Sequence, residues 1–363
     1  MSFEKVGFIG LGLIGGSIAK TIKKKYPDTT LIATARHADT IQEAHDFGTI
    51  ENDTLLPLSD FADCDYIFLC TPVQQNLIYL KELKSVIKPS CIITDVGSVK
   101  SDIHKAVTAL DIEANFIGGH PMCGSEKTGF FNATEYLLEN AYYIITPTAK
   151  TAPAQLEDFH ALVKSLGSVP MILDYEKHDF ATAAISHLPH IIASSLVNLV
   201  SDLDDEQETM RTIAAGGFKD ITRIASSSPV MWQNICLSNQ EQILKLTDCY
   251  IHALQDIRSS VADARSDDII SFFRNAKDYR DSITTPVRGS LQKNYSVYCD
   301  LVDEAGAIAT LATIMASHNI SIKNIGILHN REYEDGVLQI EFYEEDALEK
   351  AVKLMEDNHY VVH

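Results

Sequence analysis

A glycine-rich loop close to the start of the chain, Gly10-Leu11-Gly12-Leu13-Ile14-Gly15, places the strongest constraint on the fold. It follows a short apolar run, Val6 to Ile9, and opens a helical stretch from Ser17 to Lys25. Glycines at this spacing permit a tight turn and the close approach of a pyrophosphate, which then lies at a helix N-terminus. The loop therefore predicts a dinucleotide-binding unit. A glycine-rich turn without a ligand is the simpler alternative.

Further apolar runs indicate that strands and helices alternate in the N-terminal part. They cover residues 30–33, 66–70, 91–95 and 142–146. Short apolar strands separated by helices are typical of a doubly wound parallel sheet, where ligands bind at the carboxyl ends of the strands. We predict an α/β Rossmann domain over residues 1–167. Its cofactor contacts are expected from Gly10, Gly12, Leu13, Ile14, Gly15, Arg36, Thr71, Pro72 and Ser98.

Helical patterns dominate the middle of the chain, including residues 181–203 and 238–265. The first of these stretches is apolar on most sides, and a helix of that kind needs partners on most sides. We therefore predict an all-helical substrate and dimerisation domain over residues 168–292, and a homodimer.

A third pattern begins after the predicted linker at residues 286–290. Residues 293–363 show the order β-α-β-β-α, which is typical of a split βαβ, ferredoxin-like α+β domain. The predicted elements are 295–301, 306–318, 321–328, 336–343 and 346–358, with a further short strand at 360–362 as an open alternative.

Charge and composition exclude several classes of partner. The chain has 363 residues and a net charge of −20, which argues against nucleic acid and anionic membranes. An anionic substrate must therefore be attracted by a local cluster of positive groups. We see neither a leader peptide nor an apolar run of the ~20 residues that a membrane helix needs. The seven cysteines are scattered without a CxxC pair, so we expect buried thiols in a cytoplasmic protein.

The segment Gly118-Gly119-His120-Pro121-Met122 carries the main chemical signal. Glycines and a proline around His120 predict a turn, in which the imidazole can face a ligand. A neutral imidazole is suited to act as a general base near pH 7. Together with the glycine loop, it predicts an oxidoreductase that removes a hydroxyl proton while a hydride leaves for a nicotinamide.

Two positions near the predicted cofactor cleft keep alternatives open. An acidic residue is expected about 20 positions after the glycine loop, but Ala35 and Arg36 stand there. Arg36 can admit the 2′-phosphate of NADP or be a solvated charge that stacks on the adenine, so both NAD and NADP remain open. Ser98, in Asp95-Val96-Gly97-Ser98-Val99-Lys100, can bond a ligand or cap the following helix, and the two roles can coexist.

Two segments of the helical part carry candidate substrate contacts. In Ser186-His187-Leu188-Pro189-His190 a metal pair lacks a third ligand at suitable spacing, so we predict no metal. We interpret His190 as a substrate contact and His187 as a structural group, beside a break in the helix caused by the proline. Arg223 is suited to bidentate capture of a carboxylate, although an ion pair with Asp220 is the simpler reading.

Five motifs in this order resemble those of the prephenate dehydrogenase family, in its bacterial, tyrosine-synthesising form with a C-terminal ACT domain. They are Gly10-x-Gly12-x-x-Gly15-Gly16-Ser17, residues 95–100, residues 118–125, residues 186–190, and residues 216–225 with Trp232 beyond. The resemblance covers essentially the whole chain. It implies oxidative decarboxylation of prephenate to 4-hydroxyphenylpyruvate, with hydride transfer to NAD or NADP.

The same resemblance implies roles for individual residues. His120 and Ser98 correspond to catalytic positions, and His120 to the histidine that bonds the ring hydroxyl. The implied substrate positions are His190, Arg223, Asp220, which supports the arginine, and Glu126, which tunes the pocket.

The tail resembles an ACT domain, a small ligand-sensing fold that usually pairs across a dimer. This implies tyrosine as a feedback inhibitor, bound near Gly306 and Asn324. Ala305 stands where family members often have proline, so the turn can be looser here. The alternative is a domain that only adds dimer contacts.

Three other functions compete with this interpretation. Arogenate dehydrogenase uses the same chemistry on an amino acid, and nothing in the sequence clearly recognises an α-amino group. A β-hydroxyacid dehydrogenase has a similar layout but fits the His120 motif poorly. A non-catalytic amino-acid sensor would not need the intact set of His120, His190 and Arg223.

Overall fold

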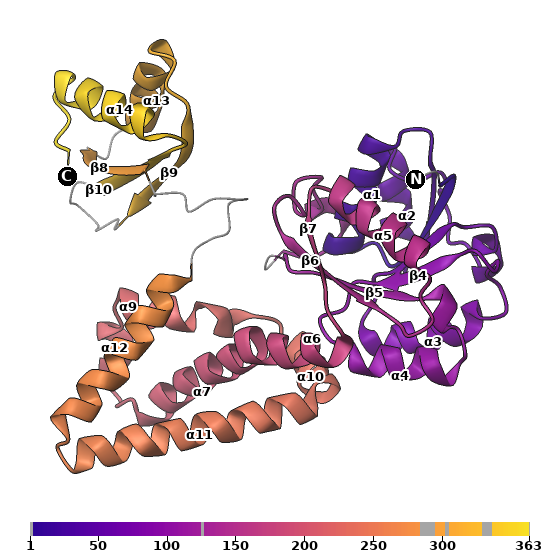
Figure 1. The fold of residues 1–363 in the computed structure, drawn as a ribbon, viewed down its shortest axis with the longest axis horizontal. Helices are drawn as coiled ribbons and strands as arrows, with labels where there is room; N and C mark the ends of the chain where they lie inside the picture. The colour runs from indigo at the N-terminus through magenta and orange to yellow at the C-terminus, as the bar shows by residue number, and fades with distance from the viewer. Residues whose placement is uncertain (1–2, 125–126, 284–294, 302–304, 329–335, 363) are drawn as a thin grey trace. The chain divides into compact units, whose positions relative to one another are not determined.

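The computed structural model of the chain describes residues 3–124, 127–283, 295–301, 305–328 and 336–362 (Figure 1). The chain forms two compact units, Met1–Ile269 and Ile270–His363. The predicted linker at 286–290 and Glu126 lie outside the described residues. The division into three domains stays a prediction.

A four-stranded parallel sheet organises the first part of the larger unit. Its order is β2-β1-β3-β4, from β1 (Lys5–Ile9), β2 (Thr30–Thr34), β3 (Tyr66–Leu69) and β4 (Ile92–Asp95). All four strands are almost wholly buried, because helices cover both faces. This confirms the predicted doubly wound sheet.

Each face of this sheet has its own hydrophobic core. Apolar side chains of α1 (Leu13–Lys25), α2 (Ala38–Asp46) and α5 (Pro153–Ser165) pack on one face. Those of α3 (Val73–Leu83) and α4 (Ser101–Ala109) pack on the other. Figure 1 shows α3 and α4 on the side of the sheet opposite to α1 and α5. The parallel strands consequently present their carboxyl ends at a single edge, where the loops meet.

A second sheet continues the first. It has the order β5-β6-β7, with β5 (Ile117–Pro121) antiparallel to β6 (Tyr142–Pro147) and β7 (Val169–Ile172) parallel to β6. A single bridge between Ile93 and Phe116 joins it to the β4 side. The strand β7 lies beyond residue 167, so the sheet extends past the expected end of the N-terminal domain.

The segment around His120 is a strand and not the predicted turn. Gly118 and Gly119 are needed because their neighbours lie so close. A Cβ on Gly118 would be 2.2 Å from Thr146 Oγ1, and one on Gly119 would be 2.7 Å from the Asp95 carbonyl oxygen. The glycines therefore permit close strand packing, and His120 projects from a fixed strand.

The remaining part of the larger unit is helical. The predicted helix over 181–203 is interrupted: α6 (Tyr175–Thr182) passes through a π-helical turn (Ala183–His187) into α7 (Leu188–Leu203). Such π turns are frequent at functional sites. The other helices of this part are α8 (Thr209–Ile213), α9 (Gly216–Thr222), α10 (Pro229–Ser238) and α11 (Gln240–Ala262), with a 3₁₀ turn at Arg223–Ser226. The helix α12 (Ser266–Ser282) crosses the boundary into the smaller unit. Further 3₁₀ turns lie at Leu58–Phe61, Glu113–Asn115 and Phe130–Asn132.

The continuous stretch Tyr175–Leu203 is long and apolar enough to cross a membrane by length and composition alone. In the most apolar 18 residues of this stretch, only 17% are buried within this chain. This stretch nevertheless contains two buried polar residues, His178 and Asp179.

The smaller unit is an α+β fold, as predicted. An antiparallel sheet of order β8-β10-β9 is built from β8 (Tyr295–Leu301), β9 (Ile322–Leu328) and β10 (Gly336–Phe342). The helices that accompany this sheet are α13 (Ala307–Ser317) and α14 (Glu345–Asp357). The short strand considered at 360–362 is a single bridge between Cys299 and Val362.

Candidate active site

The glycine loop is tightly packed at Gly10 and Gly15 and open at Gly12. Gly10 has a φ of +95°, and a Cβ on Gly15 would lie 2.5 Å from the Gly10 carbonyl oxygen. A Cβ on Gly12 would meet nothing within 4 Å. Gly12 caps α1 without a side-chain hydrogen bond, so the backbone at Leu13 and Ile14 begins the helix at an open N-terminus. The loop thus offers a space that fits a phosphate group.

A cavity of about 350 Å³ lies at the edge of the sheet where the parallel strands end. Three of the predicted cofactor residues line it: Thr71 and Pro72, after β3, and Ser98, after β4. The opposite wall comes from α10 and includes Met231 and Asn234. The fold therefore brings together the ends of two strands, as the sheet topology predicts, and adds a helix of the later segment, which the sequence did not predict.

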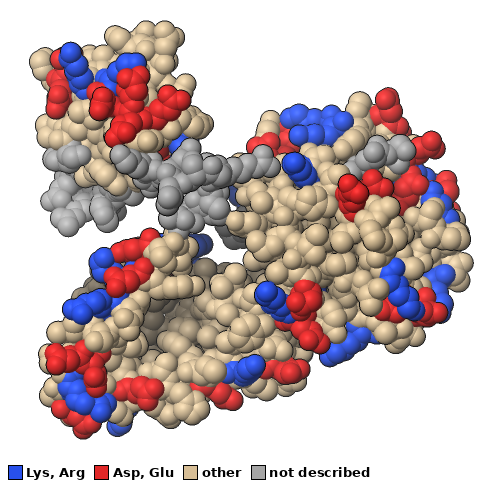
Figure 2. Space-filling model, viewed as in Figure 1, with Lys and Arg blue, Asp and Glu red and all other residues tan. Residues whose placement is uncertain are grey.

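Arg36 follows the carboxyl end of β2 and is exposed. The preceding residue, Ala35, is half-buried. Over the visible face of the N-terminal part, Lys and Arg are interspersed with Asp and Glu (Figure 2). The contact of Arg36 with the adenosine end of a dinucleotide stays a prediction.

A buried ion pair fixes the loop that carries Ser98. Lys100 and Asp95 are both fully buried and pair with each other, and Lys100 Nζ also donates to the Gly119 carbonyl oxygen at 2.6 Å. The Gly97 N–H donates to Asp95 Oδ2 at 2.9 Å. Burial lowers the pKa of Lys100, against the opposing effect of Asp95. The loop after β4 is thereby held against β5, next to His120.

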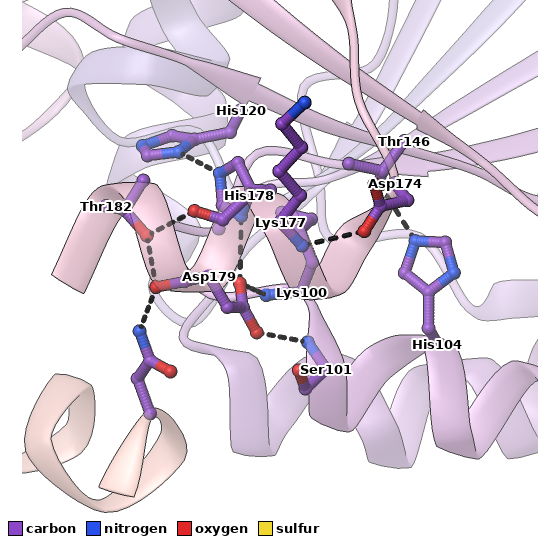
Figure 3. A network of polar contacts seen from close by, with 12 residues as sticks. Lys100, Ser101, His104, His120, Thr146, Asp174, Lys177, His178, Asp179 and Thr182 are labelled. Atoms are coloured by element: carbon purple, nitrogen blue, oxygen red, sulfur yellow. Dashed lines mark hydrogen bonds and ion pairs between the residues drawn. The ribbon is translucent and has the colours of Figure 1, made fainter. Parts of the chain in front are cut away.

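His120 is the first residue of a hydrogen-bonded row that continues through His178 and Asp179 to the start of α4 (Figure 3). Its Nδ1 lies 2.8 Å from His178 Nε2, and His178 Nδ1 lies 2.8 Å from Asp179 Oδ1. The Asp179 carboxylate accepts hydrogen bonds from the backbone N–H groups of Lys100 and Ser101, both at 2.8 Å. His178 and Asp179 come from α6, whereas His120 comes from β5.

The environment of His120 favours the neutral imidazole. Burial, followed by the nearby His178, Lys100 and His187, lowers the pKa of His120 well below its ordinary value. For Asp179, burial acts to raise the pKa, but hydrogen bonds from His178, Ser101 and Lys100 outweigh it and lower the pKa. Both shifts favour a neutral His120 and an ionised Asp179, with His178 between them.

The two histidines after the π turn differ in role. His187 is buried, its Nδ1 lies 3.2 Å from Asn239 Nδ2, and burial lowers its pKa to about 4. His190 is partly exposed and stacks on Trp232 with the ring centroids 3.8 Å apart. The Trp232 indole N–H is buried without a hydrogen-bond partner. The environment of His187 is that of a structural group, and His190 and Trp232 form one aromatic wall.

Arg223 begins the 3₁₀ turn that follows α9, and its side chain is exposed. Asp220 is exposed too, and among the described residues no ion pair joins the two. The Arg223 charge acts on His190, whose pKa is lowered by burial first and by Arg223 as well. The cation is thus close to His190 and available to an anionic group.

Within the described residues, no group of three or more His, Cys, Asp or Glu side chains could hold a metal ion. Gly306, with a φ of +96°, caps α13, and Asn324 lies exposed on β9, both in the smaller unit.

Comparison with known proteins identifies the family. Residues 18–172 match the family described as prephenate dehydrogenase, nucleotide-binding domain, and residues 174–275 match prephenate dehydrogenase, dimerization domain. A prephenate dehydrogenase of Bacillus subtilis is 39% identical over 349 residues, which cover 96% of this chain and 94% of the relative. The chain belongs to the prephenate dehydrogenase family. The predicted family, nucleotide-binding fold and oxidoreductase class are confirmed.

Two solved structures resemble the larger part of the chain. The first is prephenate dehydrogenase from A. aeolicus in complex with hydroxyphenyl propionate and NAD+. It has 28% identity and a TM-score of 0.73, and covers 78% of this chain and 99% of its own. Synechocystis arogenate dehydrogenase has 30% identity and a TM-score of 0.70, and covers 77% and 100%. About a fifth of this prephenate dehydrogenase family member therefore has no counterpart in either structure.

His178 and Asp179 were missed in the sequence. The only local signal is a His-Asp dipeptide in a short helix that begins at a capping aspartate, Asp174, whose side chain accepts from the Lys177 N–H. That signal does not reveal that the dipeptide faces His120, which precedes it by 58 residues.

Proposed function

We propose that this chain converts prephenate to 4-hydroxyphenylpyruvate, with His120 as the base that takes the proton of the C4 hydroxyl. Prephenate carries a hydroxyl at C4 and a carboxylate at C1 of its ring. A hydride cannot leave C4 unless the hydroxyl oxygen becomes a carbonyl, so the hydroxyl proton must be removed. The observation that carries the proposal is a neutral His120, held in place from behind at the edge of the nucleotide-binding sheet.

The other site residues would bind and orient the substrate. Ser98, on the loop held by Lys100, is placed to bond the reacting hydroxyl or the nicotinamide. Arg223 would fix a carboxylate and so set C4 against the cofactor, with His190 as a further contact. Asp220 and Glu126 are proposed as supporting positions on the resemblance alone.

The residues present fit a nicotinamide dinucleotide. Gly12 leaves a space that a Cβ would occupy, and the first turn of α1 begins without a side-chain cap. NAD is the proposed cofactor, and Arg36 keeps NADP as a second possibility. When bound, the nicotinamide accepts the hydride; loss of carbon dioxide then makes the ring aromatic and the reaction effectively irreversible.

The test is an initial-rate assay at the absorbance band of the reduced nicotinamide, with prephenate and either NAD or NADP. We expect His120→Asn to lower kcat by about two orders of magnitude or more and to leave the KM for prephenate nearly unchanged. His160→Asn on α5 is the matched control and should have wild-type rates. Full activity of His120→Asn would remove His120 from the mechanism.

Arogenate is the second candidate substrate, since the Synechocystis arogenate dehydrogenase is 30% identical. The same assay with arogenate distinguishes the two activities. A higher kcat/KM with arogenate than with prephenate would reassign the substrate, and cofactor reduction with neither would contradict the enzyme proposal.

We further propose that residues 293–363 are an ACT domain that senses tyrosine, and that the chain forms a homodimer. The support is the β-α-β-β-α unit itself and the solved relatives, which lack a counterpart for about this share of the chain. A chain that ends at residue 292 should stay active and lose tyrosine inhibition. Retained inhibition would place tyrosine in the active site. The cytoplasmic location stays a prediction.

A further inference from the structure

His178 and Asp179 form a buried pair next to His120, and the proposed function gives neither of them a contact with substrate or cofactor. Both side chains are almost completely buried, at 1% and 0% exposure. Burying an imidazole and a carboxylate is costly unless each is hydrogen-bonded. Here they bond to each other, to the start of α4, and to His120. A pair with a structural role alone would not require His178 Nε2 to face the proposed catalytic base, His120.

The direction of each hydrogen bond follows from the carboxylate. Asp179 is ionised and can only accept, so His178 must carry its proton on Nδ1 and donate it to Asp179 Oδ1. When His178 carries only this one proton, its Nε2 has a lone pair. Because that nitrogen faces His120 Nδ1 at 2.8 Å, His120 must donate from Nδ1. The remaining nitrogen of His120, Nε2, is left unprotonated.

The N-terminus of α4 fixes the carboxylate at the other end of the row. Two backbone N–H groups, of Lys100 and Ser101, donate to the two oxygens of Asp179. The positive end of a helix dipole favours a negative charge at this point. Asn239 also donates to the Asp179 backbone carbonyl at 2.8 Å, which anchors the residue from α11.

We propose that Asp179 and His178 are positioning residues that hold His120 in the Nδ1–H tautomer, so that its Nε2 lone pair faces the substrate hydroxyl. The inference rests on the proposed function for the identity of the substrate. The proton of that hydroxyl goes to His120 Nε2, and the imidazolium that forms keeps its Nδ1–H bond to His178. Asp179 remains ionised and supplies the compensating negative charge on this side of the ring.

The experiment compares three variants of the full chain. His178→Phe keeps a ring in the buried space but removes both nitrogens. His178→Gln keeps a side-chain oxygen that can accept from His120. Thr182→Val is the matched control, since Thr182 is also buried on α6 but donates only to the backbone carbonyls of His178 and Asp179.

The first readout is the tautomer of His120, measured by ¹H–¹⁵N correlation of the imidazole nitrogens in ¹⁵N-histidine-labelled protein without substrate. The His120 signals are assigned by their loss in His120→Gln. We expect Nδ1 protonated and Nε2 bare in the wild type and in Thr182→Val, and protonation shared between the two nitrogens in His178→Phe. A wild-type His120 protonated on Nε2 would overturn the inference.

The second readout is steady-state kinetics with prephenate and NAD. We expect His178→Phe to lower kcat at least tenfold, with the KM values for both substrates within about threefold of wild type. His178→Gln should recover part of kcat, and this variant also decides the question if His178→Phe does not fold. Wild-type kcat in His178→Phe, or an equal loss in Thr182→Val, would refute the positioning role.

The two readouts separate this inference from the proposed function. If the wild type shows the expected tautomer but oxidises neither prephenate nor arogenate, the hydrogen-bond assignment stands and the substrate proposal fails. If it oxidises prephenate but His120 is protonated on Nε2, the proposed function stands and the positioning role fails.

Discussion

Two glycines three positions apart in one loop should separate cofactor binding from stability. Gly12→Ala adds a methyl group that has no protein atom within 4 Å, and the backbone φ of Gly12 is −85°, which alanine adopts without strain. The protein alone should therefore be unaffected, or gain about 0.4–1 kcal/mol from a less flexible unfolded chain. The methyl group would, however, occupy the space proposed for the pyrophosphate.

Gly15→Ala adds the same group where there is no room. Its Cβ would lie 2.5 Å from the Gly10 carbonyl oxygen and 2.8 Å from Cys70 Cβ. Because the first of these atoms is backbone, no side-chain rotation relieves the clash, and α1 must move away from β1. Overpacking of this kind costs about 1–3 kcal/mol, or roughly 2–12 °C in melting temperature for a unit of this size.

Thermal unfolding by circular dichroism and titration with NADH measure the two effects separately. Trp232 is the single tryptophan of the chain, so energy transfer from it to bound NADH gives a direct binding signal. We expect Gly12→Ala to weaken NADH binding about tenfold or more, equivalent to ~1.4 kcal/mol, at an unchanged melting temperature. Wild-type affinity in Gly12→Ala would refute the assignment of this loop to the cofactor, and a large loss of its stability would refute the packing argument.

Three further predictions follow from buried or exposed charges. Lys100→Met leaves a buried carboxylate without its cation and should reduce the free energy of unfolding by about 3–5 kcal/mol in urea denaturation; a loss below 1 kcal/mol would contradict the importance of the pair. Burial lowers the pKa of both His104 and His187 to about 4, so the unfolded chain takes up protons on them below its ordinary pKa while the folded chain does not. The free energy of unfolding should thus fall as the pH is lowered below about 6.5, by about 2 kcal/mol per histidine at pH 5. Replacing His187 with Gln should make this fall with decreasing pH less steep, as measured by urea denaturation at several pH values. Arg36→Ala should raise the KM for NADP about tenfold and leave that for NAD within about twofold; equal effects on both would show that Arg36 does not contact a 2′-phosphate.

Most of the fold could be predicted because its elements have local signals. Apolar runs separated by helices mark β1 to β4 and β6, and the whole β-α-β-β-α order of the smaller unit follows from alternation and helical spacing. The strands β5 and β7 were missed. They contain Gly118, Gly119, Pro121 and Pro170, which are poor strand formers, and only their pairing with β6 makes them strands.

The candidate site was predictable where it lies on the edge of the parallel sheet. Topology alone brings Gly12, Thr71, Pro72 and Ser98 to one edge, because parallel strands end on the same side. His120 was recognised by its residue type, but its backbone conformation was not. The groups that His120 contacts could not be predicted. His178 and Asp179 come close to it only because α6 packs against α4 and β5, and this packing leaves no pattern in the sequence.

The row of groups behind His120 also links the two segments that the family comparison separates. His120 lies within residues 18–172, matched as the nucleotide-binding domain, whereas His178 and Asp179 lie within residues 174–275, matched as the dimerization domain. Asp179 is held both by the start of α4 and by Asn239 at the start of α11. With His120 as the proposed base, the packing of one segment on the other sets its orientation. We therefore expect a change in the helical segment that shifts α6 to lower kcat even where it touches neither substrate nor cofactor.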